Sequence, residues 1–245
     1  EGSVMMKNKR WNKDEAKKHF HGTTNELVEI ALKFNSTKIM DPECAHYCDI
    51  YAQYFSPLRN EELKILEIGV KEGDSLLMWK EYFPNSLISG LEYNPDPLRN
   101  FEHERIQVFI GDQSDVPTLQ KIVEERGPFD IIIDDASHIM EHHQISFNYL
   151  FPDGLADKGI YIIEDLGTCY WEKWGGGFER HTSTIEFLKK LIDGTNYRFH
   201  KGGRTQYVGM PDHDTTNATY FDKNIKGLSF YKGMCVIEKG SNYAG

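Results

Sequence analysis

The stretch Ile131-Ile132-Ile133-Asp134-Asp135-Ala136-Ser137-His138 decides the fold, because a run of β-branched apolar residues ends abruptly in two carboxylates and an imidazole. An apolar run bounded by polar residues is typical of a strand buried on both faces, as in the middle of a parallel sheet covered by helices. Open α/β sheets bind their ligands outside the carboxyl ends of the strands. We therefore expect a binding site at the end of this strand.

A second stretch of the same kind, Gly159-Ile160-Tyr161-Ile162-Ile163-Glu164-Asp165, follows after a helical interval and also ends in two carboxylates. Adjacent parallel strands lie about 4.8 Å apart, so side chains at two neighbouring strand ends can share one ion. Without a cation, four carboxylates at such a place would repel one another. The two stretches together predict a metal site, and Mg²⁺ suits it because this ion favours carboxylate oxygens.

The composition is that of an acidic globular protein. The chain has 245 residues, of which 39% are hydrophobic, and this is enough to bury one full core. A formal net charge of −10 argues against a nucleic-acid partner, because phosphate contacts need clustered Lys and Arg. No apolar run reaches the roughly 18 residues of a membrane span, and the N-terminus has no signal-peptide core. These features predict a cytoplasmic protein with no membrane partner.

The first part of the chain is expected to be helical. An amphipathic helix is predicted over 12–34, a turn-rich loop over 35–42 and an aromatic helix over 46–55. Four aromatic residues of the last helix fall on one face, and we favour a place in the hydrophobic core for them. They are Tyr47, Tyr51, Tyr54 and Phe55. Lys38 and His46 are weaker candidates for lining a pocket.

The first expected strand, 64–70, passes into a helix near Ser75 through a loop that contains glycines. From Glu67 to Gly73 the sequence is E-x-G-x-x-x-G, which differs from the dinucleotide-binding pattern G-x-G-x-x-G. An acidic Glu67 at the strand end would repel a pyrophosphate and suits a cationic ligand. S-adenosylmethionine, which carries a sulfonium and an ammonium group, is such a ligand. The loop therefore favours S-adenosylmethionine over NAD as the cofactor.

The next two expected strands, 86–91 and 106–110, bring further polar residues to the same edge of the sheet. Glu92 closes the first of them, at the place where Rossmann-like sites bind ribose hydroxyls. Asp112 follows the other strand and can either reach the adenine edge or cap the next helix; for Asp115 we favour capping. The full set expected to bind S-adenosylmethionine is Glu67, Gly69, Gly73, Ser75, Glu92, Asp112, Gln113 and Asp134.

His138 lies three positions beyond Asp135, and an imidazole can accept the proton of a hydroxyl group near neutral pH. We expect His138 to act as general base beside Asp135. The alternative is that Asp134 or Ser137 caps the following helix and that His138 only packs. One of two successive strand residues must point away from the site, so the sequence leaves open which of Asp134 and Asp135 faces the metal.

The second half of the chain continues the alternation of strands and helices and ends in a hairpin. Strands are predicted over 129–133 and 160–163, helices over 116–125, 139–149 and 184–191, and hairpin strands over 227–231 and 234–238. Residues 166–177 are too aromatic for a linker and too rich in glycine for an element, which indicates a lid over a small-molecule pocket. Residues 201–217 show no period and are expected to form a surface loop.

Several blocks of the sequence resemble the macrocin and mycinamicin sugar O-methyltransferase family, over about 37–239. They are Phe55-Ser56-Pro57-Leu58-Arg59, Leu66-Glu67-Ile68-Gly69-Val70, Trp79 with Tyr82-Phe83-Pro84, Gly111-Asp112-Gln113-Ser114, Ile133-Asp134-Asp135-Ala136-Ser137-His138 and Ile163-Glu164-Asp165. The resemblance implies a Rossmann-like class I methyltransferase fold in the α/β class, with a C-terminal antiparallel hairpin. It also implies an N-terminal helical extension or lid over 1–60 and a methyltransferase domain over 61–245.

The function implied by this resemblance is transfer of a methyl group from S-adenosylmethionine to a hydroxyl of a sugar or glycosylated small molecule. The metal ligands of Mg²⁺ would be Asp135, Glu164 and Asp165, and the base would be His138. The family usually has Gly where this chain has Ala136. A methyltransferase for a non-sugar polar molecule and a non-catalytic nucleotide-binding module are the alternatives. The acceptor and a possible homo-oligomer stay open.

Overall fold

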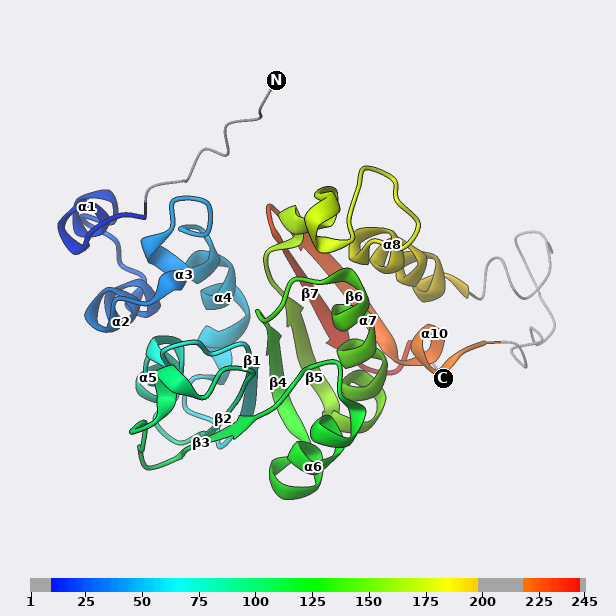
Figure 1. Cartoon of the computed structure of the whole chain (residues 1–245), viewed down its shortest axis with the longest axis horizontal. Coiled ribbons are helices and arrows are strands. Elements are labelled where there is room, and N and C mark those ends of the chain that lie inside the picture. Colours follow the sequence, from blue (N-terminus) through cyan, green and yellow to red (C-terminus); the bar gives the residue numbers. More distant parts are fainter. Residues whose placement is uncertain (1–9, 198–217, 243–245) are drawn as a thin grey trace.

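Within the part of the chain that the structure describes, seven strands form one sheet in the order β3-β2-β1-β4-β5-β7-β6. This computed structural model describes residues 10–197 and 218–242 (Figure 1). The strands are β1 (Lys64–Ile68), β2 (Leu87–Glu92), β3 (Ile106–Ile110), β4 (Phe129–Asp134), β5 (Leu155–Ile163), β6 (Ile225–Tyr231) and β7 (Met234–Lys239). β1 to β5 are parallel, and β7 is antiparallel to both of its neighbours. The predicted Rossmann-like α/β fold with a C-terminal antiparallel hairpin is confirmed.

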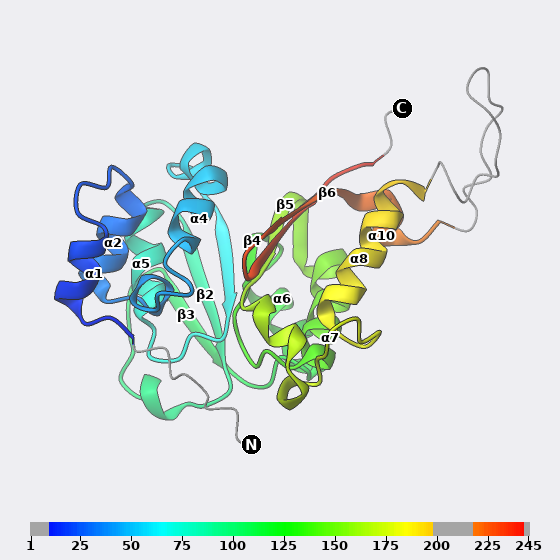
Figure 2. The same cartoon turned by 90° about the horizontal axis from the view of Figure 1, so that it is seen from above.

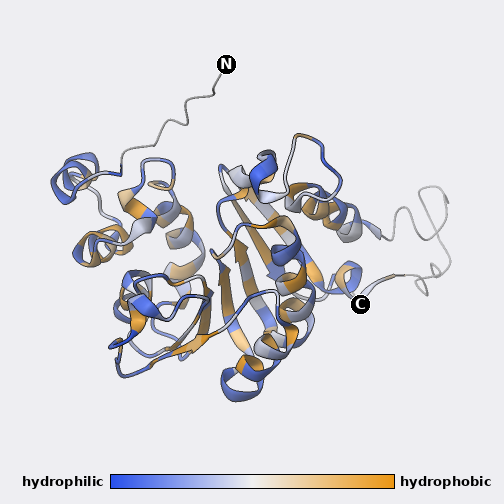
Figure 3. Ribbon diagram, viewed as in Figure 1, coloured by the Kyte–Doolittle hydropathy of each residue, from blue (hydrophilic) through white to orange (hydrophobic). Residues whose placement is uncertain are grey.

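β4 lies in the middle of the sheet, between β1 and β5, because its side chains are apolar on both faces. Ile131 and Ile133 belong to the hydrophobic core on one face, and Ile132 belongs to the core on the other. All three are fully buried, and Figure 3 shows the strands in the middle of the sheet mainly in the orange of hydrophobic residues. The carboxyl ends of β1, β4 and β5 therefore meet at one edge, where the polar residues that follow β4 and β5 come together.

The helices form two groups, one on each face of the sheet, as Figures 1 and 2 show. One group consists of α1 (Lys13–His19), α2 (Glu26–Phe34), α3 (Thr37–Met40), α4 (Tyr47–Phe55) and α5 (Asp74–Tyr82). The other consists of α6 (Val116–Arg126), α7 (Met140–Tyr149), α8 (Thr184–Thr195) and α10 (Tyr220–Asn224). Shorter turns are the 3₁₀ helices η1 (Ser56–Leu58), η2 (Asp96–Leu98), η4 (Leu166–Tyr170) and η5 (Glu172–Trp174) and the π-helix η3 (Leu150–Gly154). Across the described ranges, no helix has both the length and the apolar character that crossing a membrane requires.

The prediction of one helix over 12–34 is wrong, because the chain turns between α1 and α2. Gly22 in this turn has a φ of 81°, in the left-handed region that glycine adopts readily. Asn25 then caps α2, since its side chain accepts a hydrogen bond from the backbone N–H of Leu27. The amphipathic pattern is correct for α2 itself, which buries Leu27 and Ile30.

The predicted loop over 35–42 contains α3, a single helical turn that was not expected. The side chain of Ser36 caps this turn by accepting a hydrogen bond from the backbone N–H of Lys38. The backbone N–H of Thr37 donates to Asp74 Oδ2 at the start of α5, over 2.9 Å. These two contacts fix α3 over the carboxyl ends of the strands.

Helix α4, which lies before position 60, packs against the sheet. Tyr51 and Phe55 of α4 share one buried cluster with Ile65 of β1 and Trp79 of α5. The predicted division into an extension over 1–60 and a domain over 61–245 therefore separates two segments that share one hydrophobic core. The predicted loop over 201–217 lies outside the described residues.

Candidate active site

The carboxyl ends of the parallel strands open into a cavity of about 680 Å³. Most of the predicted cofactor and metal residues line it. They are Gly69, Ser75, Glu92, Asp112, Gln113, Asp135, His138, Glu164 and Asp165. Three predicted residues, Glu67, Gly73 and Asp134, are not among the residues that line the cavity. The nine lining residues follow β1 to β5, as expected for an open α/β sheet.

At one end of the cavity, the loop after β1 is tied to the end of β2. Gly69 has a φ of 87°, and its N–H donates to the carbonyl oxygen of Leu91 over 2.8 Å. Oε2 of Glu92 accepts hydrogen bonds from the backbone N–H groups of Val70 and Lys71, over 3.1 and 2.7 Å. These bonds hold the Glu92 carboxylate at the cavity wall, where it was predicted to bind the ribose.

Asp112 and Gln113, which follow β3, line the same end of the cavity. Backbone and side-chain hydrogen bonds from Ser114 lower the pKa of Asp112 below its ordinary value. Gln113 accepts a hydrogen bond from the N–H of Ser137 over 2.9 Å, so it joins this end of the cavity to the loop after β4. Asp115 caps α6 through the N–H of Thr118, as favoured from the sequence.

Asp134 and Asp135 point to opposite faces, because side chains alternate along a strand. The Asp134 carboxylate is fully buried and accepts hydrogen bonds from Gln113 Nε2 (3.0 Å), Ser146 Oγ (2.7 Å) and Tyr161 Oη (3.3 Å). Asp134 is therefore a buried polar residue beneath the site and is not among the residues that line the cavity. Asp135 is the one that faces the cavity.

Glu67 and Gly73 also lie behind the cavity wall. Oε2 of Glu67 accepts hydrogen bonds from Ser75 Oγ over 2.6 Å and from Trp79 Nε1 over 3.2 Å, and the side chain is fully buried. The cation that faces Glu67 in this structure is Lys38, whose Nζ lies 2.9 Å from Oε1 as an ion pair. Gly73 precedes α5, where a β-carbon would lie 2.3 Å from the ring of Phe101.

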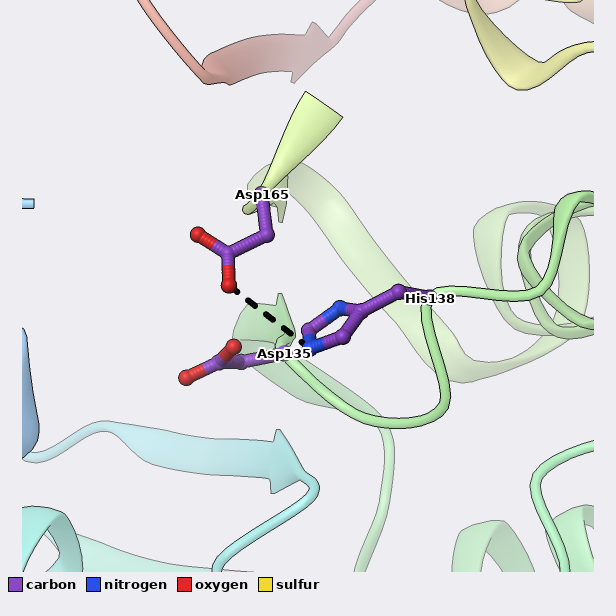
Figure 4. A group of neighbouring side chains, drawn as sticks. All are labelled: Asp135, His138 and Asp165. Carbon is purple, nitrogen blue, oxygen red and sulfur yellow. Dashed lines mark ion pairs between the residues drawn. The ribbon is translucent and has the colours of Figure 1, made fainter. Parts of the chain in front are cut away.

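Three side chains that follow β4 and β5 converge at the cavity, and Figure 4 shows them pointing toward one another. Asp135, His138 and Asp165 each offer one ligand atom, and these atoms lie within 4.8 Å of one another. Nε2 of His138 lies 3.6 Å from Oδ2 of Asp165. Two carboxylates and an imidazole are donors that a divalent cation accepts, so this arrangement fits a metal ion. The predicted ligands Asp135 and Asp165 are thus brought together, with the predicted base beside them.

Glu164, the third predicted metal ligand, is held by two other groups. Its Oε1 lies 2.6 Å from Nζ of Lys38 and also accepts a hydrogen bond from the hydroxyl of Tyr51. Among the described residues, Glu164 is not part of the group formed by Asp135, His138 and Asp165. It lines the cavity next to that group.

The aromatic helix contributes more to the site than the sequence indicated. The ring of Tyr51 lies in the core as expected, but its hydroxyl reaches Glu164. The hydroxyl of Tyr47 lies 3.0 Å from Oδ1 of Asp165. The pattern of apolar rings predicted the core position, and only the choice of Tyr over Phe could have indicated buried polar partners. His46, the weaker pocket candidate, contacts the carbonyl oxygen of Lys232 instead.

Lys38, the other weak candidate, is the functional residue that sequence reasoning underestimated. Its Nζ lies close to three carboxylates, those of Glu67, Asp135 and Glu164. Burial alone would lower the pKa of Lys38, but the three carboxylates outweigh burial and hold the pKa well above its ordinary value. The side chain is therefore a buried ammonium cation.

The segment 166–177 packs beside the site. The ring centroid of Trp174 lies 5.9 Å from that of His138, in an edge-to-face arrangement. None of residues 166–177 is among those that line the cavity, so the expectation of a lid over the pocket is not met in this arrangement. Two aromatic side chains of this segment, Tyr170 and Trp171, are exposed.

The sheet has the strand order of a class I methyltransferase fold, with one reversed strand, β7. Its cavity, lined by the glycine loop after β1 and by Glu92 at the end of β2, also fits this class. Solved structures of the MycE methyltransferase from the mycinamycin biosynthetic pathway are similar to the chain over 89% of its length. The structure with Mg and SAH bound gives a TM-score of 0.76 at 33% sequence identity, and the match covers 55% of the MycE chain. The structure with mycinamycin VI also bound gives a TM-score of 0.74 at 32% sequence identity, and the match covers 56% of the MycE chain.

Curated proteins give the same result. Demethylmacrocin O-methyltransferase of Streptomyces fradiae is 37% identical over 205 residues, 80% of this chain and 49% of that protein. Mycinamicin VI 2''-O-methyltransferase of Micromonospora griseorubida is 36% identical over 205 residues, 80% of this chain and 48% of that protein. The chain spans about half the length of the curated relatives it matches, and no family model matches it. The chain is a homologue of the macrocin- and mycinamicin-type sugar O-methyltransferases.

Proposed function

We propose that this protein transfers a methyl group from S-adenosylmethionine to a hydroxyl group of a sugar on a small molecule, and that the reaction needs Mg²⁺. The observation that carries the proposal is the convergence of Asp135, His138 and Asp165 on a cavity that Gly69 and Glu92 also line. This arrangement gives a place for a cation, a base and a nucleoside in one cavity. Homology to sugar O-methyltransferases supports the choice of acceptor.

The cofactor would lie along the ends of β1, β2 and β3. Gly69 lets the nucleoside approach the backbone, because it has no side chain at a φ of 87°. Glu92 would bind the ribose, and Asp112 and Gln113 would lie near the adenine. Glu67 and Gly73 support this end from behind, Glu67 through its hydrogen bond to Ser75. Asp134 supports it through Gln113.

Asp135 and Asp165, with Glu164 beside them, would hold Mg²⁺, which orients a hydroxyl group and makes it more acidic when bound. His138 suits the role of base better than that of ligand, because Mg²⁺ prefers oxygen donors and imidazole suits transition metals. Its Nε2 faces Asp165, and this nitrogen would accept the hydroxyl proton as the methyl group arrives. Tyr47 would keep Asp165 in place through its hydroxyl.

The predicted cytoplasmic location and the exclusion of nucleic acid as a partner are part of this proposal. Two other functions remain to be tested against it. The acceptor is a non-sugar polar molecule in the first, and the protein binds a nucleotide without catalysis in the second. The identity of the acceptor and the methylated position distinguish a non-sugar methyltransferase from the proposed enzyme. Turnover distinguishes a nucleotide-binding protein without catalysis from it.

The test is a methyl-transfer assay with isotopically labelled S-adenosylmethionine. The acceptors are glycosylated macrolides and polyketides, sugar nucleotides, saccharides and, as non-sugar controls, catechols and polyols. We expect a labelled product from a glycosylated acceptor, with the methyl group on a sugar oxygen, and loss of turnover in excess EDTA that Mg²⁺ restores. Methylation of a catechol alone, or binding of S-adenosylhomocysteine without any turnover, would contradict the proposal.

A further inference from the structure

The buried ammonium of Lys38 lies among carboxylates from three strand ends. Its Nζ is 2.6 Å from Glu164 Oε1, 2.9 Å from Glu67 Oε1 and 3.0 Å from Asp135 Oδ2. The ammonium donates hydrogen bonds to Glu164 and Asp135, and it faces Glu67 as an ion pair. In the described ranges, no other lysine or arginine forms an ion pair with any of the three. The ammonium is therefore the cation of this part of the site.

The position of Lys38 is fixed by its surroundings. Asp74 and Ser36 accept hydrogen bonds from the backbone N–H groups of Thr37 and Lys38 at the start of α3, and the side chain of Lys38 is 1% exposed. The ring of Tyr51 covers the ammonium, with its centroid 5.9 Å from Nζ. An ion buried in this way is stable only beside opposite charges, so the ammonium and the carboxylates hold each other in place.

Asp135 belongs to two groups of cation ligands at once. On one side it shares the ammonium with Glu67 and Glu164, and on the other side it forms the candidate metal group with His138 and Asp165. The centre therefore contains two adjacent cation positions that share one carboxylate. Sites with two neighbouring metal ions share ligands in the same way.

We propose that Lys38 occupies the second cation position of a centre built for two cations, and so restricts the protein to a single divalent ion. The ammonium supplies one positive charge where a second metal would supply two. The inference concerns the number of bound ions and goes beyond methyl transfer, so its test can succeed or fail independently of the proposed activity. Lys38 is therefore a positioning residue, because it holds the carboxylates of Asp135 and Glu164 in place beside the single ion.

The test counts bound Mn²⁺ in the purified protein by isothermal titration calorimetry and by electron paramagnetic resonance. Lys38→Ala removes the ammonium and leaves room, so we expect it to bind one more ion than the parent. Two close Mn²⁺ ions that share Asp135 should also show spin coupling. Lys38→Met removes the charge but fills the space, and it should not gain an ion. Lys33→Ala is the surface control, because Lys33 is exposed and forms an ion pair with Glu81, away from the cavity, and it should bind like the parent.

An unchanged number of ions in a folded Lys38→Ala protein would overturn the proposal. If this variant folds only when Mn²⁺ is present, the ion has replaced the ammonium and the proposal is supported. If it does not fold under either condition, Lys38→Gln is used, which keeps amide hydrogens near the carboxylates. That variant makes the centre one charge more negative, so Mn²⁺ should bind at least about tenfold more tightly; unchanged affinity would overturn the proposal. A parent without bound ion, and a Lys38→Ala protein with one, would also overturn the proposal, because Lys38 would then occupy the one cation position of the site. Methyl transfer in excess EDTA would reject the metal in the proposed function separately.

Discussion

A β-carbon on Gly69 would lie 2.3 Å from the backbone carbonyl oxygen of Asp135. The loop that is expected to receive the cofactor and the loop that carries the metal ligand are thus in direct backbone contact. The N–H of Asp135 also donates to the carbonyl oxygen of Ile68 over 2.9 Å, immediately before Gly69. A side chain at position 69 would therefore displace both loops, and its effects on cofactor and metal binding would occur together.

We expect Gly69→Ala to lower the free energy of unfolding by about 2–5 kcal/mol, from a left-handed backbone and a steric clash together. Gly22→Ala is the matched control, because Gly22 also has a positive φ but would meet no atom within 4 Å. This control should lose only about 1–2 kcal/mol. Urea unfolding of both proteins measures the difference. Equal losses would show that the contact with Asp135 has no energetic weight.

His138→Ala should reduce kcat by roughly 10²–10⁴-fold, because a positioned general base contributes about that much. The affinity for S-adenosylhomocysteine should stay nearly unchanged, since His138 follows β4, whereas the residues expected to bind the cofactor belong to the ends of β1, β2 and β3. Single-turnover kinetics and calorimetry give the two quantities. His21→Ala, at an exposed position, serves as the control. A variant that keeps most of its kcat would mean that the proton leaves by another route.

Tyr51→Phe should lower the free energy of unfolding by about 1.5–3 kcal/mol, because the hydroxyl of Tyr51 donates a hydrogen bond to a buried carboxylate. Tyr54→Phe, in the same helix, is the control. Its hydroxyl pairs with the neutral hydroxyl of Tyr231 over 3.0 Å, so the loss should be about 0.5–1.5 kcal/mol. The idea fails if thermal and urea unfolding show the same loss for both variants.

We expect the free energy of unfolding to depend on pH through His143, which is buried in α7. Burial lowers the pKa of His143 below 6.5 in the folded protein. Below about pH 6.5 the unfolded chain therefore binds a proton that the folded protein does not, and the free energy of unfolding falls as the pH is lowered. Above that pH the contribution of His143 is fully present.

His143→Gln should remove this contribution, so that stability in the acidic range depends less on pH, by up to about 1.4 kcal/mol per pH unit. Urea unfolding at a series of pH values below 7 measures the slope. The exposed His21→Gln variant should keep the slope of the parent. Parallel pH profiles for His143→Gln and the parent would contradict the assignment.

The sheet and the strand ends could be predicted because their signals are local. Runs such as Ile131 to Ile133 are apolar on both faces, and the polar residues that follow β4 and β5 must then meet at one edge. On this basis Asp135, His138 and Asp165 were expected to come together, and in the structure they do. The choice between Asp134 and Asp135 depends on which face each strand residue presents, and only the structure showed it.

Lys38 and Tyr51 could not be assigned in this way, because their partners are far away in the sequence. Lys38 is separated from Asp135 by 97 positions and from Glu164 by 126. A lysine in a turn-rich segment gives no local sign that it is buried. The break between α1 and α2 was missed for the opposite reason: a continuous helical pattern concealed a local turn at Gly22.

The distance in sequence between Lys38 and Glu164 also sets an order of events during protein synthesis. A lysine is buried stably only together with its carboxylate partners. The last of the three partners of Lys38 to be synthesised is Glu164, which the ribosome adds 126 residues after Lys38. We expect α3 to stay undocked on a nascent chain that ends before β5, and to dock late, as contacts between distant residues generally form slowly. Proteolysis of ribosome-bound chains arrested before and well after Glu164 would show this. Cleavage near Lys38 should be fast in the first and slow in the second.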